Sequence, residues 1–258
     1  EIGVRLVGSE MCIRDRCKVI AEDKTAAYTY TWKANTVAVV SDGSAVLGLG
    51  NIGPYAAMPV MEGKCVLFKE FGNVNAVPIC LDTQDTEEII QAVKNIAPGF
   101  GGINLEDISA PRCFEIEERL KEMLDIPVFH DDQHGTAIVV LAGIINGLRV
   151  TGKKKEDCRV VVNGAGSAGV AITKLLLTYG FKHVTMCDRE GIIGKDYPNL
   201  NWMQKKMTEV TNLENAPGTL ADALRGADIF VGVSAPNIVT PEMVSSMNKD
   251  AILLSLIH

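Results

Sequence analysis

A glycine-rich segment in the C-terminal half restricts the possible folds of this chain more than any other feature. Gly164, Gly166 and Gly169 match the pattern G-x-G-x-x-G. The hydrophobic run Arg159–Asn163 comes directly before them, and a helix is predicted over Ser167–Tyr179. A strand, a tight glycine turn and a helix in this order open a βαβ unit. The sequence therefore predicts an α/β fold with a mostly parallel sheet in this half.

The same segment is a candidate dinucleotide-binding site. A helix N-terminus offers free backbone N–H groups and partial positive charge to phosphates. The candidate pyrophosphate-binding residues are Gly164, Ala165, Gly166, Ser167, Ala168 and Gly169. Asp188 ends the next predicted strand, where a carboxylate accepts a hydrogen bond from the ribose 2′-hydroxyl and favours NAD. Arg189 is adjacent and could instead pair with the 2′-phosphate of NADP, so both cofactors stay open.

Alternation of short strands and helices predicts an α/β architecture for the whole chain. The boundary between two domains is expected near residue 129, giving an N-terminal domain over 17–129 and a Rossmann-type domain over 130–258. Expected strands are 36–40, 65–68, 77–82, 127–129, 184–188, 228–233 and one that begins at 251; expected helices are 86–96, 112–124, 136–149 and 220–226.

Two pairs of adjacent acids stand at the ends of predicted strands. Glu106 and Asp107 form the first pair, and Asp131 and Asp132 form the second. Neighbouring side chains on a strand point to opposite faces, so both members reach one site only where the strand breaks into a loop. Such breaks are expected at 108–111 and 133–135. Carboxylates without cysteine suit Mg²⁺ or Mn²⁺, whereas helix capping and surface acids are the alternative.

Two other residue types near these acids have possible chemical roles. His130 and His134 flank the second pair and are expected to be buried, hydrogen-bonded histidines rather than ligands. Lys64 is expected to open a strand, with a surface position as the alternative. A partly desolvated lysine beside a bound cation has a lowered pKa, which suits a general base.

Composition excludes several classes of function. The 258 residues are 47% hydrophobic, which predicts packed domains, and the net charge of -7 argues against nucleic-acid binding. No run of about 18 apolar residues predicts a membrane span. Seven scattered cysteines without a C-x-x-C motif indicate reduced thiols and a cytoplasmic protein.

Both ends of the sequence are expected to be non-native. A DNA sequence that encodes Met11–Arg16 has a reverse complement that encodes Leu254–His258. One DNA element, read in opposite orientations, would therefore encode both ends of the sequence. Residues 1–16 and about 254–258 are left out of the fold prediction for this reason.

From about Cys17 to Ile252 the chain resembles the bacterial-type malic enzymes. Several blocks in the same order carry the resemblance: Val39–Gly50, Met58–Lys64, Asn104–Asp107, His130–Ala137 and the glycine fingerprint. The resemblance implies a malic-enzyme domain followed by an NAD(P)-binding domain, a homo-oligomer, and a divalent Mg²⁺ or Mn²⁺ ion. It implies oxidative decarboxylation of (S)-malate to pyruvate and CO₂ with reduction of NAD or NADP.

The resemblance also assigns roles to particular residues. Lys64 matches the general base that takes the proton of the substrate hydroxyl. Glu106, Asp107 and Asp132 match the metal ligands, and Asp131 matches the acid that supports lysine and metal. The proton-donating tyrosine and an asparagine-containing substrate loop of the family have no match here, so the chain as written is expected not to turn over malate.

Three alternatives remain. A malolactic enzyme would share the fold and metal site but release lactate. A metal-free dehydrogenase of the shikimate or amino-acid type would keep its activity without a cation. A dinucleotide-binding fragment would bind the cofactor without turnover.

Overall fold

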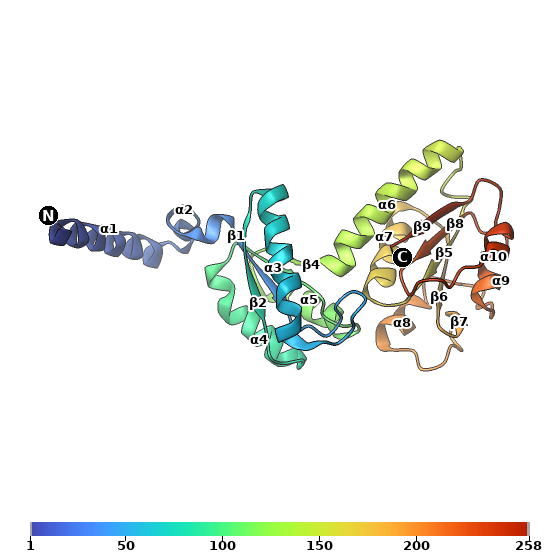
Figure 1. Cartoon of the computed structure of the whole chain (residues 1–258), viewed down its shortest axis with the longest axis horizontal. Helices are drawn as coiled ribbons and strands as arrows, with labels where there is room; N and C mark the ends of the chain where they lie inside the picture. The colour runs from blue at the N-terminus through green and yellow to red at the C-terminus, as the bar shows by residue number, and fades with distance from the viewer. Residues whose placement is uncertain (1, 257–258) are drawn as a thin grey trace. The chain divides into compact units, whose positions relative to one another are not determined.

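A computed structural model describes residues 2–256 of the chain, and side chains from residue 12 onward (Figure 1). The described chain divides into two compact units. The first comprises the residues up to 108 together with 116–129, and the second comprises 109–115 and the residues from 130 onward. Ile257 and His258, part of the expected non-native end, lie outside the described residues, as does Glu1.

The first unit is built around a four-stranded sheet with the order β2-β1-β3-β4. The strands are β1 (Thr36–Ser41), β2 (Asn75–Cys80), β3 (Gly102–Leu105) and β4 (Val128–His130). Both neighbours of β1 run parallel to it. The carboxyl ends of parallel strands meet at one edge of a sheet, and in α/β proteins ligands bind at that edge.

Helices connect these strands. The N-terminal helices α1 (Ile2–Glu22) and α2 (Ala27–Tyr30) come before β1, and α4 (Thr86–Ile96) and α5 (Arg112–Met123) flank β3 in the chain. Asp85 caps α4 by accepting from the backbone N–H groups of Glu87 and Glu88. Short 3₁₀ turns cover Lys24–Ala26, Trp32–Asn35 and Ala97–Gly99.

The strand predicted over 65–68 is wrong, because these residues lie inside the 20-residue helix α3 (Gly53–Gly72). A short apolar run does not distinguish a strand from a helix. Ala57 and Met61, one helical turn apart, are fully buried, whereas Val66 and Leu67 are 64% and 49% exposed. The burial therefore follows the helical period, and the apolar run faces outward. Lys64 lies within this helix rather than at the start of a strand.

The second unit is a five-stranded sheet with the order β7-β6-β5-β8-β9. Its strands are β5 (Arg159–Asn163), β6 (His183–Asp188), β7 (Gly191–Ile192), β8 (Ile229–Gly232) and β9 (Ile252–Ser255). All neighbours pair in parallel except β6 and β7. This order, with the first strand of the unit at the centre, is the predicted Rossmann-type arrangement.

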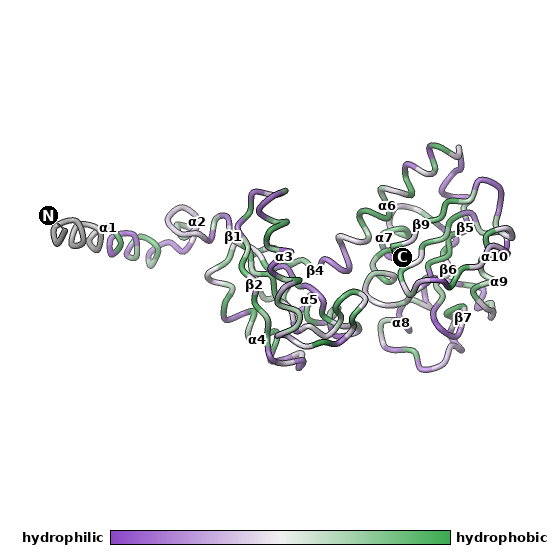
Figure 2. Tube along the Cα trace, viewed as in Figure 1, coloured by the Kyte–Doolittle hydropathy of each residue, from purple (hydrophilic) through white to green (hydrophobic). Residues whose placement is uncertain are grey.

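Alternate residues of β5 point into two separate cores. Val160 and Val162 pack with α6 (Asp131–Thr151) and α7 (Ser167–Tyr179) on one face. Val161 packs on the other face with residues of α9 (Leu220–Leu224). Figure 2 shows the hydrophobic character of the strands in this sheet. A continuous valine run is what a strand buried on both faces requires.

The remaining helices are α8 (Trp202–Met207) and α10 (Pro241–Ser245).

Helix α6 begins at Asp131, five residues before the predicted start at 136. The loop expected at 133–135 is therefore wrong, and Asp131 and Asp132 occupy the first helical turn. The helix is long and apolar enough to meet the length and composition criterion for a membrane span. It packs Ala137, Val140 and Ile144 into the core of the second unit, as a core helix does.

The lysine-rich turn after α6 is a structural anchor of the second unit. Lys153 Nζ lies 2.7 Å from Asp228 Oδ1, and Lys155 Nζ lies over the ring of Tyr179, 4.2 Å from its centroid. Burial raises the pKa of Asp228, but hydrogen bonds from Lys153, the Arg159 backbone and Asn248 outweigh it and lower this pKa below its usual value. The turn thus ties α6 to the start of β8.

Candidate active site

The first acidic pair lies where β3 ends. Glu106 and Asp107 are only 5% and 4% exposed. The Glu106 backbone N–H donates to the carbonyl oxygen of Val40, and the Asp107 carbonyl accepts from the Ala45 backbone N–H, each at 2.9 Å. Asp107 has a φ of 54°. The strand therefore ends just before this pair, earlier than the break predicted at 108–111, and backbone hydrogen bonds hold both residues at the edge of the sheet.

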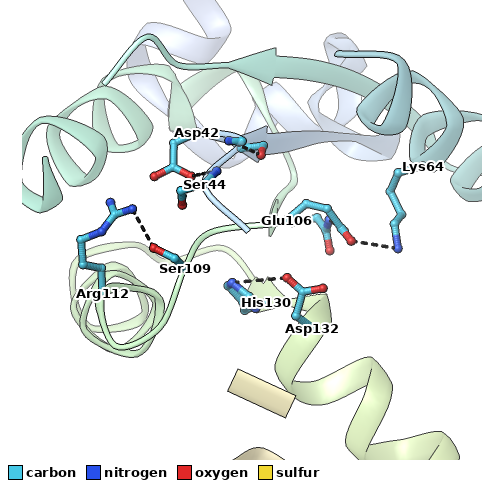
Figure 3. A network of polar contacts seen from close by, with 11 residues as sticks. Asp42, Ser44, Lys64, Glu106, Ser109, Arg112, His130 and Asp132 are labelled. Atoms are coloured by element: carbon cyan, nitrogen blue, oxygen red, sulfur yellow. Dashed lines mark hydrogen bonds and ion pairs between the residues drawn. The ribbon is translucent and has the colours of Figure 1, made fainter. Parts of the chain in front are cut away.

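Lys64 comes to this pair from α3. Its Nζ atom lies 3.3 Å from Glu106 Oε1, and the two side chains point toward one another in Figure 3. The lysine side chain is 22% exposed and the glutamate side chain 7%. Asn104 Nδ2 donates to the other carboxylate oxygen, Glu106 Oε2, at 2.8 Å. One carboxylate is thus held between an amide and an ammonium group.

A buried turn supports the edge of the sheet beside the acids. Asp42 is fully buried after β1, and its Oδ1 atom accepts from the backbone N–H and the hydroxyl of Ser44 at 3.0 and 2.6 Å (Figure 3). The next residue, Ala45, donates to Asp107. The turn therefore fixes the backbone that holds Asp107 in place.

The second acidic pair opens α6 in the second unit. His130 is the residue before the first helical turn and is fully buried. Its Nε2 atom lies 4.0 Å from Asp132 Oδ2, whose side chain is 31% exposed (Figure 3). Carboxylates in a first turn interact favourably with the partial positive charge of the helix N-terminus. Both acids therefore lie at the positive end of the helix.

Gly135 leaves room for the carboxylate of Asp131. A Cβ atom added at Gly135 would lie 2.2 Å from Asp131 Oδ1. The Asp131 carboxylate therefore lies against Gly135, one helical turn further along the chain. A larger residue at position 135 would displace it. The sequence alone indicated a loop at this glycine, so its relation to Asp131 was not predicted.

A cavity of about 470 Å³ lies at the carboxyl ends of β5, β6 and β8. Five of the eight predicted cofactor residues line it: Gly164, Ala165, Gly166, Asp188 and Arg189. Ser167, Ala168 and Gly169 are not among the lining residues and form the first turn of α7. The fingerprint therefore divides into residues that line the cavity and residues that shape the turn beside it.

The three glycines of the fingerprint are needed for different structural reasons. Gly164 has a φ of 120°, in the region that disfavours other residues. A Cβ atom on Gly169 would lie 1.7 Å from the Gly164 carbonyl oxygen, so the helix meets the strand only without a side chain there. A Cβ atom on Gly166 would meet nothing within 4 Å. Gly166 thus leaves open space at the N-terminus of α7.

Asp188 is held at the end of β6 inside the cavity wall. Its Oδ1 atom accepts from the Arg189 backbone N–H at 2.9 Å, and Gln204 Nε2 lies 3.4 Å from Oδ2. Burial, and secondarily the charge of Asp188, raises the pKa of the neighbouring Cys187 thiol to about 12. The thiol therefore stays protonated beneath the cavity.

Several lining residues were not predicted from the sequence. Ser234 follows β8, and its Oγ accepts from Asn163 Nδ2 at 2.8 Å. The others that went unpredicted are Asn163, Glu190, Gly191, Thr219, Leu220, Val233, Ala235 and Ile238. The rule that loops after parallel strands line the ligand site could have found Ser234 and Ala235.

At the acidic site, Asn104 was also not predicted. It could have been found as the residue two before Glu106 on the same strand face.

The acids at the end of β3 are chemically suited to a divalent cation. Two adjacent carboxylates that are both nearly buried carry a desolvation cost, which a positive ion offsets. Their donors are all oxygen, the ligand type that Mg²⁺ and Mn²⁺ prefer. The donor set therefore fits the predicted metal.

Together, the two units define an α/β protein of the dinucleotide-binding class, with a buried acid–lysine site in its first unit and a Rossmann-type cavity in its second. Residues 14–121 match the malic enzyme N-terminal domain, and residues 133–252 match the malic enzyme NAD-binding domain. The chain belongs to the malic enzyme family.

Relatives with known names support this assignment. An NAD-dependent malic enzyme of Geobacillus stearothermophilus is 62% identical over 242 residues, which is 93% of this chain and 50% of the relative. A bifunctional malic/malolactic enzyme of Bacillus subtilis is 54% identical over 95% of this chain and 60% of its own length. The chain therefore spans about half to three fifths of these two relatives.

A solved structure agrees with both units. The crystal structure of an NAD-dependent malic enzyme from Thermotoga maritima has a TM-score of 0.92 and 51% identity, covering 95% of this chain and 67% of that one. The predicted α/β class and the family resemblance are confirmed.

The two fingerprint glycines give a matched pair of substitutions. Gly169→Ala places a methyl group against a backbone carbonyl, so we expect the free energy of unfolding to fall by about 2–3 kcal/mol. Gly166→Ala enters open space and should change it by less than about 1 kcal/mol. NADH titration of Gly166→Ala should show affinity reduced roughly tenfold or more. Equal stability of the two variants, or unchanged NADH affinity, would contradict this division of roles.

Proposed function

We propose that the chain is the substrate-, metal- and coenzyme-binding part of an NAD(P)-dependent malic enzyme. The reaction converts (S)-malate to pyruvate and CO₂ as a hydride passes from C2 to the nicotinamide. The observation that supports this best is the buried contact between Lys64 and Glu106 within a chain of this family. Residues 17–129 would hold the substrate and supply Lys64, Glu106 and Asp107, and residues 130–258 would hold the coenzyme and supply Asp131 and Asp132.

We assign Glu106, Asp107 and Asp132 as the metal ligands. The family resemblance assigns all three, and the two that lie in the first unit, Glu106 and Asp107, are both nearly buried. Strand β4 neighbours β3 in the sheet, and Asp132 follows Phe129 of β4 by three residues. Three residues span at most about 11 Å, so Asp132 is tethered near the edge where Glu106 and Asp107 lie. When bound, Mg²⁺ or Mn²⁺ would act as a Lewis acid on the C2 oxygen.

Lys64 is the proposed general base. Its amine takes the proton of the C2 hydroxyl as the hydride leaves, and Glu106 positions the amine. Asn104 holds the other oxygen of Glu106, so the carboxylate keeps one orientation. Asp131, whose carboxylate folds over Gly135, is the proposed supporting acid for lysine and metal.

Two further expectations concern the whole protein. We propose a homo-oligomer, as the family resemblance implies. We also propose a cytoplasmic location, because all seven cysteines are free thiols, as in a reducing compartment. Cell fractionation tests the location.

Loss of the lysine amine tests the proposed activity. In the natural protein that carries this sequence, Lys64→Met should lower kcat for malate-dependent NADH formation by roughly 10²- to 10⁴-fold, the usual contribution of a general base. The dissociation constant for NADH should not change. Lys69→Met on the same helix is the control, because the Lys69 amine bonds to Asn73 and Asn75 instead of an acid of the site. A Lys64→Met enzyme with full activity would disprove the role of Lys64.

Removal of one carboxylate charge tests the metal site. For Asp107→Asn we expect the Mn²⁺ dissociation constant, measured by calorimetry, to rise at least about tenfold, because a buried anionic ligand is lost. Asp125→Asn, in the loop that precedes β4, is the control and should bind Mn²⁺ normally. Equal Mn²⁺ affinity in both variants would exclude Asp107 as a ligand.

The coenzyme preference follows from Asp188. Its carboxylate lines the cavity, and a 2′-phosphate would meet a like charge there. We therefore propose NAD as the preferred coenzyme, with Arg189 as the residue that would permit NADP. Titration with NAD⁺ and NADP⁺ should show tighter NAD⁺ binding, and Asp188→Ala should reduce the difference roughly tenfold or more. Preference of the unmodified chain for NADP⁺ would contradict this assignment.

A malolactic enzyme is the second candidate. The Bacillus subtilis relative bears the name of a bifunctional malic/malolactic enzyme, so one relative combines both reactions. Lactate in place of pyruvate and NADH, measured with limiting NAD, would favour this candidate.

A further inference from the structure

Gln133, in the first turn of α6, is a buried polar residue to which the proposed mechanism gives no role. It is only 5% exposed, and its Nε2 atom makes no hydrogen bond to any of the residues that the structure describes. A buried amide without a partner destabilises a fold, so such a group in a native protein needs an explanation. A ligand that accepts from this amide would supply one.

The amide belongs to the buried face of α6. The buried residues of this helix are Gln133, Ala137, Val140 and Ile144, which follow one another at the spacing of a single helical face. The last three pack into the core of the second unit with residues of α7. Gln133 therefore continues this core-facing stripe at the N-terminal end of the helix.

The packing of α6 on β9 shows at which end of the sheet this amide lies. A Cβ atom added at Gly147 would lie 2.9 Å from Ile252 Cδ1. One added at Gly143 would lie 3.4 Å from Leu254 Cδ1. The helix thus runs antiparallel to β9, which ends at residue 255. Gln133 precedes Gly143 by about 15 Å of helix, so it lies beyond the carboxyl ends of the parallel strands.

The neighbouring helix α7 leads to the same position. Lys155 Nζ donates to the carbonyl oxygen of Tyr179 at 2.6 Å, which joins the turn after α6 to the last residue of α7. The C-terminal ends of these two packed helices therefore lie together, and so do their N-terminal ends. Because α7 begins at the glycine fingerprint, Gln133 lies on the fingerprint side of the second unit.

The order of the strands indicates which half of a dinucleotide would meet Gln133. Asp188, the proposed partner of the adenosine ribose, ends β6 on one side of β5. Helix α6 packs against β9, on the other side of β5. A dinucleotide lies across this edge of the sheet with its pyrophosphate at the fingerprint. The half on the side of Gln133 would therefore carry the nicotinamide.

We propose that the Gln133 amide binds the carboxamide of the nicotinamide ring, with Nε2 donating to the carboxamide oxygen, and so fixes the ring for hydride transfer. The inference rests on the proposed coenzyme site and adds a positioning residue to it. A glutamine amide and a carboxamide each carry a donor and an acceptor, so the two groups are complementary. Binding of the coenzyme would give the buried amide the partner that it lacks.

Removal of the amide in the full-length natural protein tests this proposal. Gln133→Met keeps the length of the side chain, and the dissociation constant for NADH should rise roughly tenfold or more. ADP-ribose, which lacks the nicotinamide ring, should bind with unchanged affinity. Without coenzyme, the midpoint of thermal unfolding should stay the same or rise, because the substitution removes an unpartnered polar group. Gln91→Met is the control, because the Gln91 amide bonds to Asn95 on the exposed side of α4.

Three results would overturn the role of Gln133. They are unchanged NADH affinity in Gln133→Met, an equal loss of ADP-ribose affinity, and a lower unfolding midpoint with unchanged NADH affinity, which would show that the amide binds a structural water. Gln133→Leu is a second variant in case the first fails to fold, and ADP-ribose binding shows that either is folded. Failure of the unmodified protein to bind NADH would instead disprove the coenzyme assignment itself, and this inference with it.

Discussion

Burial of two adjacent carboxylates is the constraint on which the first unit depends. Glu106 and Asp107 lose almost all contact with water at the end of β3, and isolated buried charges of one sign are costly. The amine of Lys64 and the amide of Asn104 offset part of this cost at Glu106. Backbone hydrogen bonds from neighbouring segments hold the pair where a cation would be favourable. This burial costs the fold some stability, and it concentrates negative charge at one site.

Helix α3 satisfies two demands on opposite faces. Its buried face places Met61 in the core and directs Lys64 to Glu106, while its other face exposes aromatic and aliphatic side chains. An exposed apolar helix face is unfavourable in water unless something covers it.

The sequence predicted the second unit more accurately than the first. The bounds of β5 and α7 agree with the prediction to the residue, because a valine run, three glycines and an apolar helix all indicate one βαβ unit. In the first unit the run Cys65–Phe68 resembled a strand, because apolar residues on an exposed helix face follow no burial pattern that sequence can show. Gly63, and Pro59 inside the helix, also weakened the helical signal.

The candidate site was predictable by residue type but not by geometry. The order of the acidic residues in the sequence predicted a metal site. The structural reason why Asp131 and Asp132 suit that site differs from the expected one. They do not stand in a loop that lets neighbouring side chains converge. They stand in a first helical turn, where adjacent residues point about 100° apart and the helix N-terminus favours both charges. Gly135 then leaves space for one carboxylate to fold back, so the two acids take different directions and need not compete for one position.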